Sequence, residues 1–155
     1  MKKRIFIGLL KAILITIGLA TFVLMLWEPL LEGRNTNASL YEIYFQDIFL
    51  AYVYLASTAY YVALYQLYNL LQYWALNSIQ SLKAIKALRT IKYCSILLIL
   101  FILGAEIYFF TVQRAEGEDI AGGVALSILL IWASSVIGII AYTFEKKINT
   151  TLGNR

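Results

Sequence analysis

Apolar residues fill four long stretches of the chain, and polar and charged residues gather between them. Each stretch has about 22 to 24 residues, enough for a helix to cross a hydrocarbon core of about 30 Å. The four predicted spans cover about 5–27, 48–71, 91–112 and 120–142. Because consecutive spans cross in opposite directions, the pattern predicts an all-α integral membrane protein, an antiparallel four-helix bundle. We treat residues 1–155 as a single membrane domain.

The first apolar stretch could also be read as the signal sequence of a secreted protein. Its length of about 23 residues exceeds the 7–15 of a signal h-region, and no small-x-small cleavage pattern precedes Glu28 and Pro29. We therefore expect this span to be retained, with Trp27 at the membrane interface and Pro29 just past the helix end.

The second stretch carries most of the polar side chains found inside the spans. On a helix, seven of them fall within about 40° of one line. They are Asp47, Tyr54, Thr58, Tyr61, Tyr65, Tyr68 and Gln72. Lipid cannot bond phenol hydroxyls, so this stripe should face other helices or a wet cavity. Interhelical hydrogen bonding is the plainer interpretation, and a ligand or ion cavity is the alternative.

Two ionisable residues, Lys11 and Glu106, lie inside the spans, and each needs a partner. Counted from opposite faces, each is about 9 Å deep, too far apart for a direct bond. The same count puts Tyr54 level with Glu106 and Tyr65 level with Lys11. We expect Lys11 to extend to the inner face past Tyr65, and Glu106 to bond Tyr54 or Thr58. The predicted intramembrane polar network consists of Glu106, Tyr54, Thr58, Tyr61 and Tyr65.

The segment 75–90 and the start of the third span carry basic charges only, at three-residue spacing. The basic set is Lys83, Lys86, Arg89 and Lys92. A three-residue spacing drifts about 60° per step around a helix, so neither this set nor the apolar residues between its members keep to one face. We predict a helical segment lying on, or leading into, the inner surface. It should bind anionic lipid, or dock a partner, and contribute nothing to folding of the bundle.

The fourth span has small residues along one side of the predicted helix. They are Gly123, Ser127, Ser134, Gly138 and Ala141. Small side chains let two helix backbones approach closely, so this side should pack against a neighbouring span.

Basic residues outside the spans are distributed unevenly among the connecting segments. Ten lie at the two ends and beside the loop 75–90, whereas the acidic loops 28–47 and 113–119 contain only Arg34 and Arg114. Positive residues mark the cytoplasmic side of membrane proteins. Both termini and the basic loop are therefore predicted to be cytoplasmic, with the two acidic loops outside.

Composition agrees with a membrane protein and narrows the chemistry. The chain is 61% hydrophobic and 14% charged, against about 25% charged in soluble proteins. The net charge of +4 is explained by the basic loops, so we expect no direct contact with nucleic acid. With Cys94 as the single cysteine and no histidine, we expect no disulfide, metal, cofactor or enzymatic activity.

Several short motifs are similar to those of a known family. They are Leu31-Glu32-Gly33-Arg34-Asn35, Glu42-Ile43-Tyr44-Phe45 with Asp47, Ala63-Leu64-Tyr65-Gln66, Lys86-Ala87-Leu88-Arg89-Thr90-Ile91-Lys92-Tyr93-Cys94 and Ala121-Gly122-Gly123-Val124. On these residues the chain resembles a family of small bacterial four-span membrane proteins catalogued as domain of unknown function 2975. The resemblance implies no particular activity. Because members are often encoded beside small helix-turn-helix regulators, it does imply a regulatory partner of that kind.

We therefore expect a regulatory or sensory component of the bacterial cytoplasmic (inner) membrane that holds such a regulator through its basic segment. The alternative is a small transporter or channel component that uses the polar face of the second span and Glu106. A wet cavity between spans would favour transport, and a closed hydroxyl-bonded core beside an exposed basic surface would favour a scaffold. Anionic lipids are the other expected partner, and the sequence leaves a homo-oligomer open.

Overall fold

Four long helices make up nearly all of the computed structural model, which describes residues 2–31, 39, 41, 44, 48–114 and 120–153. The helices are α1 (Lys2–Leu31), α2 (Ile48–Ala75), α3 (Leu82–Tyr108) and α4 (Ala121–Gly153), and α3 continues into a π-helical turn, η3 (Phe109–Gln113). All four are long and apolar enough to cross a membrane, and the described residues contain no strand. The predicted all-α class and its four membrane helices are confirmed. Most of the two predicted acidic loops lies outside the described residues.

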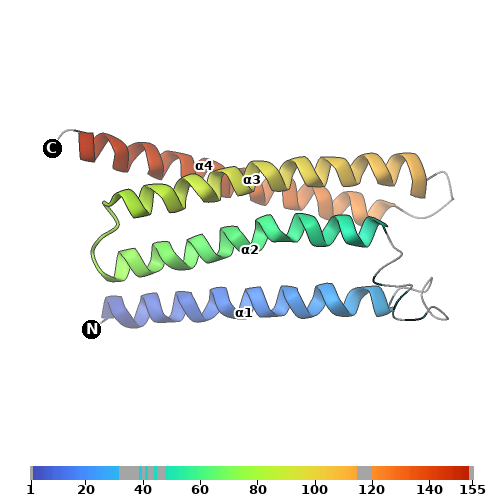
Figure 1. The fold of residues 1–155 in the computed structure, drawn as a ribbon, viewed down its shortest axis with the longest axis horizontal. Helices are drawn as coiled ribbons and strands as arrows, with labels where there is room; N and C mark the ends of the chain where they lie inside the picture. Colours follow the sequence, from blue (N-terminus) through green and yellow to red (C-terminus); the bar gives the residue numbers. More distant parts are fainter. Residues whose placement is uncertain are drawn as a thin grey trace.

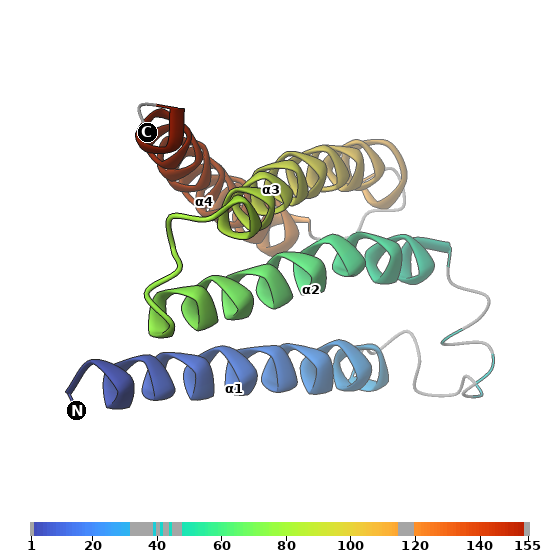
Figure 2. The ribbon, with the colours of Figure 1, turned by 60° about the vertical axis from the view of Figure 1, so that its left-hand side comes forward.

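The four antiparallel helices stand in a row in chain order (Figure 1). The contact between α3 and α4 is the most extensive, that between α2 and α3 follows, and α1 packs mainly against α2. Figure 2 shows α1 and α4 at opposite sides of the row. The bundle is therefore open, and large parts of α1 and α4 face outward.

Both termini and the α2–α3 loop lie at the same end of the molecule's long axis, along which the helices run (Figure 1). We call it the basic end, because it carries Lys2, Lys3, Arg4, Lys83, Lys86, Lys146 and Lys147. The opposite end, where α3 passes into η3, is called the far end. The basic residues that the sequence assigned to one side of the membrane thus gather at one end of the molecule.

The α2–α3 loop is short because both helices have clear end signals. At the end of α2, Asn77 adopts a left-handed conformation (φ 54°), and Ser78 N donates to Tyr73 O at 2.8 Å, as in a Schellman cap. At the start of α3, the Ser81 hydroxyl accepts from Ala84 N at 3.3 Å and caps the helix. The predicted basic helical segment therefore begins at Leu82 and leads without a break into the third span.

The most deeply buried apolar cluster lies at the basic end. It consists of Leu70, Ala84, Ile85, Ala87, Leu88, Ile91, Ala141 and Ile148. These residues come from α2, α3 and α4, so the first turns of α3 are packed between two neighbours. The apolar row of this segment is accordingly buried at Ile85, Leu88 and Ile91 but not at Leu82, which is 71% exposed. The segment therefore packs apolar side chains into the core and exposes basic side chains on the surface.

Small residues let α3 and α4 pack closely along their length. A Cβ added to Gly138 would lie 3.2 Å from Ser95 Cβ, and one added to Gly123 would lie 3.0 Å from the Phe109 ring. Ser127, Ser134 and Ala141 are buried on the same side of α4. The predicted small-residue side of the fourth span is confirmed, and its neighbour is α3.

Candidate functional site

The hydroxyl stripe of α2 faces α1 for part of its length. Tyr54 Oη donates to Met25 O at 3.2 Å, and Tyr61 Oη donates to Gly18 O at 3.5 Å. Thr58 donates within α2, to Leu55 O at 2.7 Å, and Tyr65 is 64% exposed. The stripe is therefore divided between one helix contact and the outer surface.

The bond from Tyr54 reaches a carbonyl of α1 that Pro29 cannot bond. Pro29 lies inside the last turn of α1, so the expectation that the helix ends before it is wrong. Proline has no N–H, and in an α-helix that N–H would donate to the carbonyl four residues earlier. Here that carbonyl is Met25 O, and Tyr54 donates to it. A tyrosine of α2 thus allows α1 to continue through its proline to Leu31.

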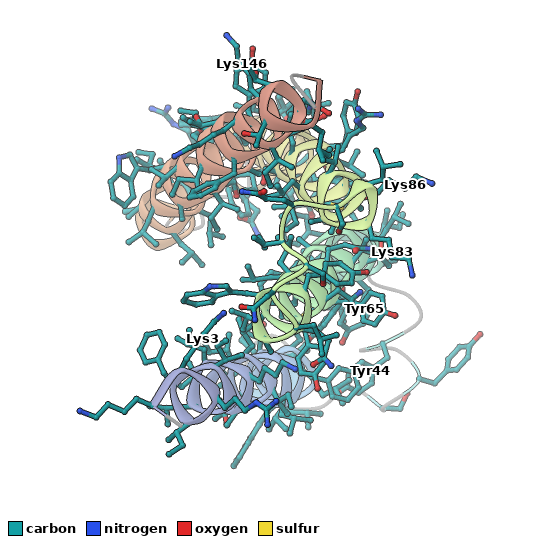
Figure 3. The ribbon with its side chains drawn as sticks, turned by 90° about the vertical axis from the view of Figure 1, so that its left-hand side faces the viewer. Lys3, Tyr44, Tyr65, Lys83, Lys86 and Lys146 are labelled. Atoms are coloured by element: carbon teal, nitrogen blue, oxygen red, sulfur yellow. The ribbon has the colours of Figure 1, made fainter. Side chains whose placement is uncertain are left out.

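Lys11 extends toward the basic end, which is the direction that we predicted. Its Nζ donates to Gln72 Oε1 and lies 4.7 Å from the centre of the Tyr68 ring. The expected route past Tyr65 is wrong, because Tyr65 points outward from α2 (Figure 3). Lys11 is instead held between an amide oxygen and an aromatic face, which both favour a cation.

Glu106 does not join the network that the sequence predicted. Its Oε1 is buried and has no hydrogen-bond partner among the described residues. Tyr54 and Thr58 each donate their single hydroxyl hydrogen to a backbone carbonyl, so neither can donate to Glu106. The expected bond from Glu106 to one of these two hydroxyls is wrong.

The orientation of α2 explains this error. Phe49 stacks on Tyr108, and the Tyr52 hydroxyl, which donates to Phe101 O at 2.6 Å, lies against Gly104. Tyr52, rather than Tyr54, is therefore the tyrosine that α2 presents to this part of α3, and its hydrogen is already donated to a carbonyl. The prediction from depth alone missed that Tyr54 faces α1.

A hollow of about 290 Å³ lies between α1 and α2. It is lined by Phe22, Met25, Leu26, Tyr54, Ser57 and Tyr61. Its walls are almost entirely apolar, because the tyrosine hydroxyls are turned to backbone carbonyls. This hollow suits an apolar group better than an ion or a water path.

An ion cluster joins α3 to α4 near the basic end. Glu145, only 6% exposed, accepts hydrogen bonds from Arg89 Nε at 2.9 Å and from Lys92 Nζ at 2.7 Å. The expectation that the basic set contributes nothing to the bundle is therefore wrong for these two residues. Lys92 Nζ also lies 5.6 Å from the centre of the Tyr142 ring on α4.

These contacts set the acidity of Glu145, which lies three residues beyond the predicted fourth span. The hydrogen bond from Lys92 holds the pKa of the Glu145 carboxyl below its usual value. The bond from Arg89 acts in the same direction, against the opposing effect of burial. Glu145 is therefore an ionised carboxylate shared by two cations.

Lys83 and Lys86, the other two members of the basic set, are exposed. They form no ion pair with any described residue, and they project from the same side of α3 at the basic end (Figure 3). The neighbouring Ala84 and Ala87 are buried in the core, so the backbone that carries both lysines is firmly placed. The predicted lipid- or partner-binding role stays a prediction for this pair.

Sequence reasoning missed two residues that hold the helices together. Tyr52, which bridges α2 to α3, lies outside the predicted stripe, and Glu145 was noted only as the single acid of the tail. A signal for Glu145 was present, because the continuous helix α4 places this acid on the same side as the small residues Gly138 and Ala141.

The fold and these contacts define a small helical membrane protein that crosses the bilayer four times. The chain belongs to the family described as "Protein of unknown function (DUF2975)", whose family model matches residues 32–146. It is similar to the "Uncharacterized membrane protein YoaS" of Bacillus subtilis (strain 168), with 28% identity over 140 residues, 88% of this chain and 85% of that protein. No solved structure matches the chain. Helix α1 lies outside the region that the family model matches.

Proposed function

We propose that this protein is a regulatory or sensory component of the bacterial inner membrane that holds a cytoplasmic partner at its basic end. The observation that carries the proposal is the exposed pair Lys83 and Lys86, on a well-packed helix end, neither of which forms an ion pair with a described residue. The partner we propose is a small helix-turn-helix regulator with an acidic surface. Both termini and the α2–α3 loop would then lie in the cytoplasm, as the uneven distribution of basic residues favours.

The charges at the basic end support binding of an anionic surface. Glu145 engages Arg89 and Lys92, whereas Lys83 and Lys86 keep their full charge available. Residues three apart on a helix are neighbours, so these two ammonium groups act on the same patch of a partner. Near an anionic membrane surface each such residue contributes about 1 kcal/mol, which makes anionic lipid the competing ligand of the same patch.

A transport role is the second candidate, and one observation favours it: the buried, unpartnered oxygen of Glu106. Two observations weigh against it. The hydroxyls of Tyr54 and Tyr61 bond backbone carbonyls, and the hollow beside them is walled by apolar groups. The bonded hydroxyls and the apolar hollow between α1 and α2 therefore favour the docking role over transport.

Site-specific photocrosslinking in cells tests the docking role. A photoreactive amino acid replaces Lys83 or Lys86, and the matched control carries it at Arg114, an exposed residue that follows η3 at the far end. We expect a helix-turn-helix regulator to be captured from positions 83 and 86 but not from 114. Capture should fall when the neighbouring lysine is changed to glutamate. Adducts with lipid alone, or equal capture of the regulator from position 114, would contradict the proposal.

A further inference from the structure

The carboxyl group of Glu106, inside the third span, has one buried oxygen, Oε1, with no hydrogen-bond partner among the described residues. Burying an acid in a lipid-facing bundle without a partner is costly, and such residues commonly mark the sites where membrane proteins bind ions or protons.

The helices packed around Glu106 place no basic residue close to it. Along their whole lengths in the membrane region, α2 (Ile48–Ala75) and α4 from Ala121 to Phe144 contain no Asp, Glu, Lys or Arg. Along α3 and η3 the nearest basic residues are Arg114, eight residues further on, just after η3, and Lys92, fourteen residues back. These separations correspond to about 12 Å and 21 Å along the helix axis. Among the described residues of α2, α3 and α4, none therefore places a positive charge beside Glu106.

Few titratable groups lie near Glu106. On α2, the Tyr52 hydroxyl donates to Phe101 O, and on α3 the Tyr108 ring stacks on Phe49 with centroids 4.8 Å apart. On α4 the segment that faces this part of α3 has no titratable side chain. None of these described groups forms a hydrogen bond with Glu106 Oε1.

One hydroxyl oxygen with a spare lone pair, that of Ser127, lies at about the level of Glu106. Ser95 lies against Gly138, and moving eleven residues along α3 to Glu106 matches moving eleven residues back along α4 to Ser127. Ser127 is buried, and its hydroxyl donates to Gly123 O at 2.9 Å, so its oxygen can still accept.

The backbone next to Glu106 departs from regular α-helix. Phe109 N–H is shared between the carbonyls of Ala105 and Glu106, and the π-helical turn η3 follows at once. A shared N–H leaves both carbonyl oxygens with weakened bonds, and π-helical turns inside helices are frequent at functional sites.

We propose that Glu106 is an intramembrane binding site for one small cation, a proton or an alkali-metal ion, that enters from the far end. Carboxylate, hydroxyl and carbonyl oxygens are the ligands such hard cations prefer. The far end is the nearer surface, because only seven residues separate Glu106 from Gln113 at the end of η3. The site goes beyond the proposed docking role and is independent of it, since Lys83 and Lys86 lie at the other end of α3.

Labelling with dicyclohexylcarbodiimide tests the site in the full chain reconstituted into liposomes. This membrane-soluble reagent adds to the acid form of a carboxyl group, and the adduct rearranges to a stable acylurea without any co-reactant. Labelling of each carboxyl is read by mass spectrometry across a pH series, and in choline, sodium or potassium chloride at equal ionic strength. Glu106→Gln is the negative control. Glu145 is the internal comparison, as a buried carboxylate already bonded to two cations.

We expect Glu106 to be labelled and Glu145 to be unlabelled near neutral pH. Labelling of Glu106 should fall at least several-fold as the pH is raised, or when sodium or potassium replaces choline. A fall with pH alone identifies the proton as ligand, and a fall with one salt identifies that ion. Absence of label in the folded protein, or label that neither pH nor cations change, would overturn the proposal. The readout involves no protein partner, so failure here leaves the docking role standing, and the reverse also holds.

Discussion

The role of a single residue can be explained here by the backbone group that it hydrogen-bonds, as Tyr54 shows. Pro29 removes the N–H that would bond Met25 O, and Tyr54 on the next helix supplies the missing donor. The Tyr54 hydroxyl therefore has a defined structural role in the α1–α2 contact.

Loss of the Tyr54 hydroxyl should therefore weaken the α1–α2 contact. We expect Tyr54→Phe to lower the free energy of unfolding by about 0.5–1.5 kcal/mol, measured by denaturant titration in bicelles. In the Pro29→Ala background the restored N–H bonds Met25 O, so the same substitution should cost much less. Tyr65→Phe is the control, since that side chain is 64% exposed. An equal cost of Tyr54→Phe in both backgrounds would show that the hydroxyl does not serve this carbonyl.

At the scale of helices, the sequence predicted which sides pack but not which residues meet. The small-residue side of α4 was predictable, because Gly138 and Ala141 admit a close neighbour whatever its register. The partner of Glu106 was not, since depth along a helix does not give the rotation about its axis, and Tyr54 faces α1. Ion pairs across helices, such as Arg89 with Glu145, depend on rotation and register together.

A larger residue at the α3–α4 contact should force these helices apart. Gly138→Val places atoms beyond a Cβ that already lies 3.2 Å from Ser95 Cβ, so we expect a loss of about 1–3 kcal/mol in unfolding free energy. The matched control is Gly122→Val on the same helix, where an added Cβ meets nothing within 4 Å. Equal effects of the two substitutions would show that the contact is looser than described.

The ion cluster should make stability depend on acidic pH. Contacts with Lys92 and Arg89 lower the pKa of Glu145 from its usual 4.5, so the folded state binds its proton less readily than the unfolded state. The stabilisation is complete above the unfolded value and is lost as the pH falls through the folded value. We expect the melting temperature of the parent to fall over this range by more than that of Glu145→Gln. Parallel pH curves for the two proteins would mean that the cluster adds no pH-dependent stability.

At the scale of the whole molecule, the open row of helices was not predictable from the apolar pattern. In a bilayer, lipid-facing and helix-facing positions are both apolar, so hydrophobicity alone cannot tell a closed bundle from a row. The distribution of charge was more informative, because the basic residues it assigned to one side do gather at one end (Figure 3). That end is the surface from which docking of a cytoplasmic partner is proposed.

The side of the membrane that this end faces is the most direct test of the account. Single cysteines replace Lys83 and Arg114, exposed residues at the two ends of the third span, in a Cys94→Ala background. A membrane-impermeant maleimide is then applied to intact and to permeabilised cells. We expect Arg114→Cys to react in intact cells and Lys83→Cys to react only after permeabilisation. Reaction of Lys83→Cys in intact cells would place the basic end outside and contradict the proposed function.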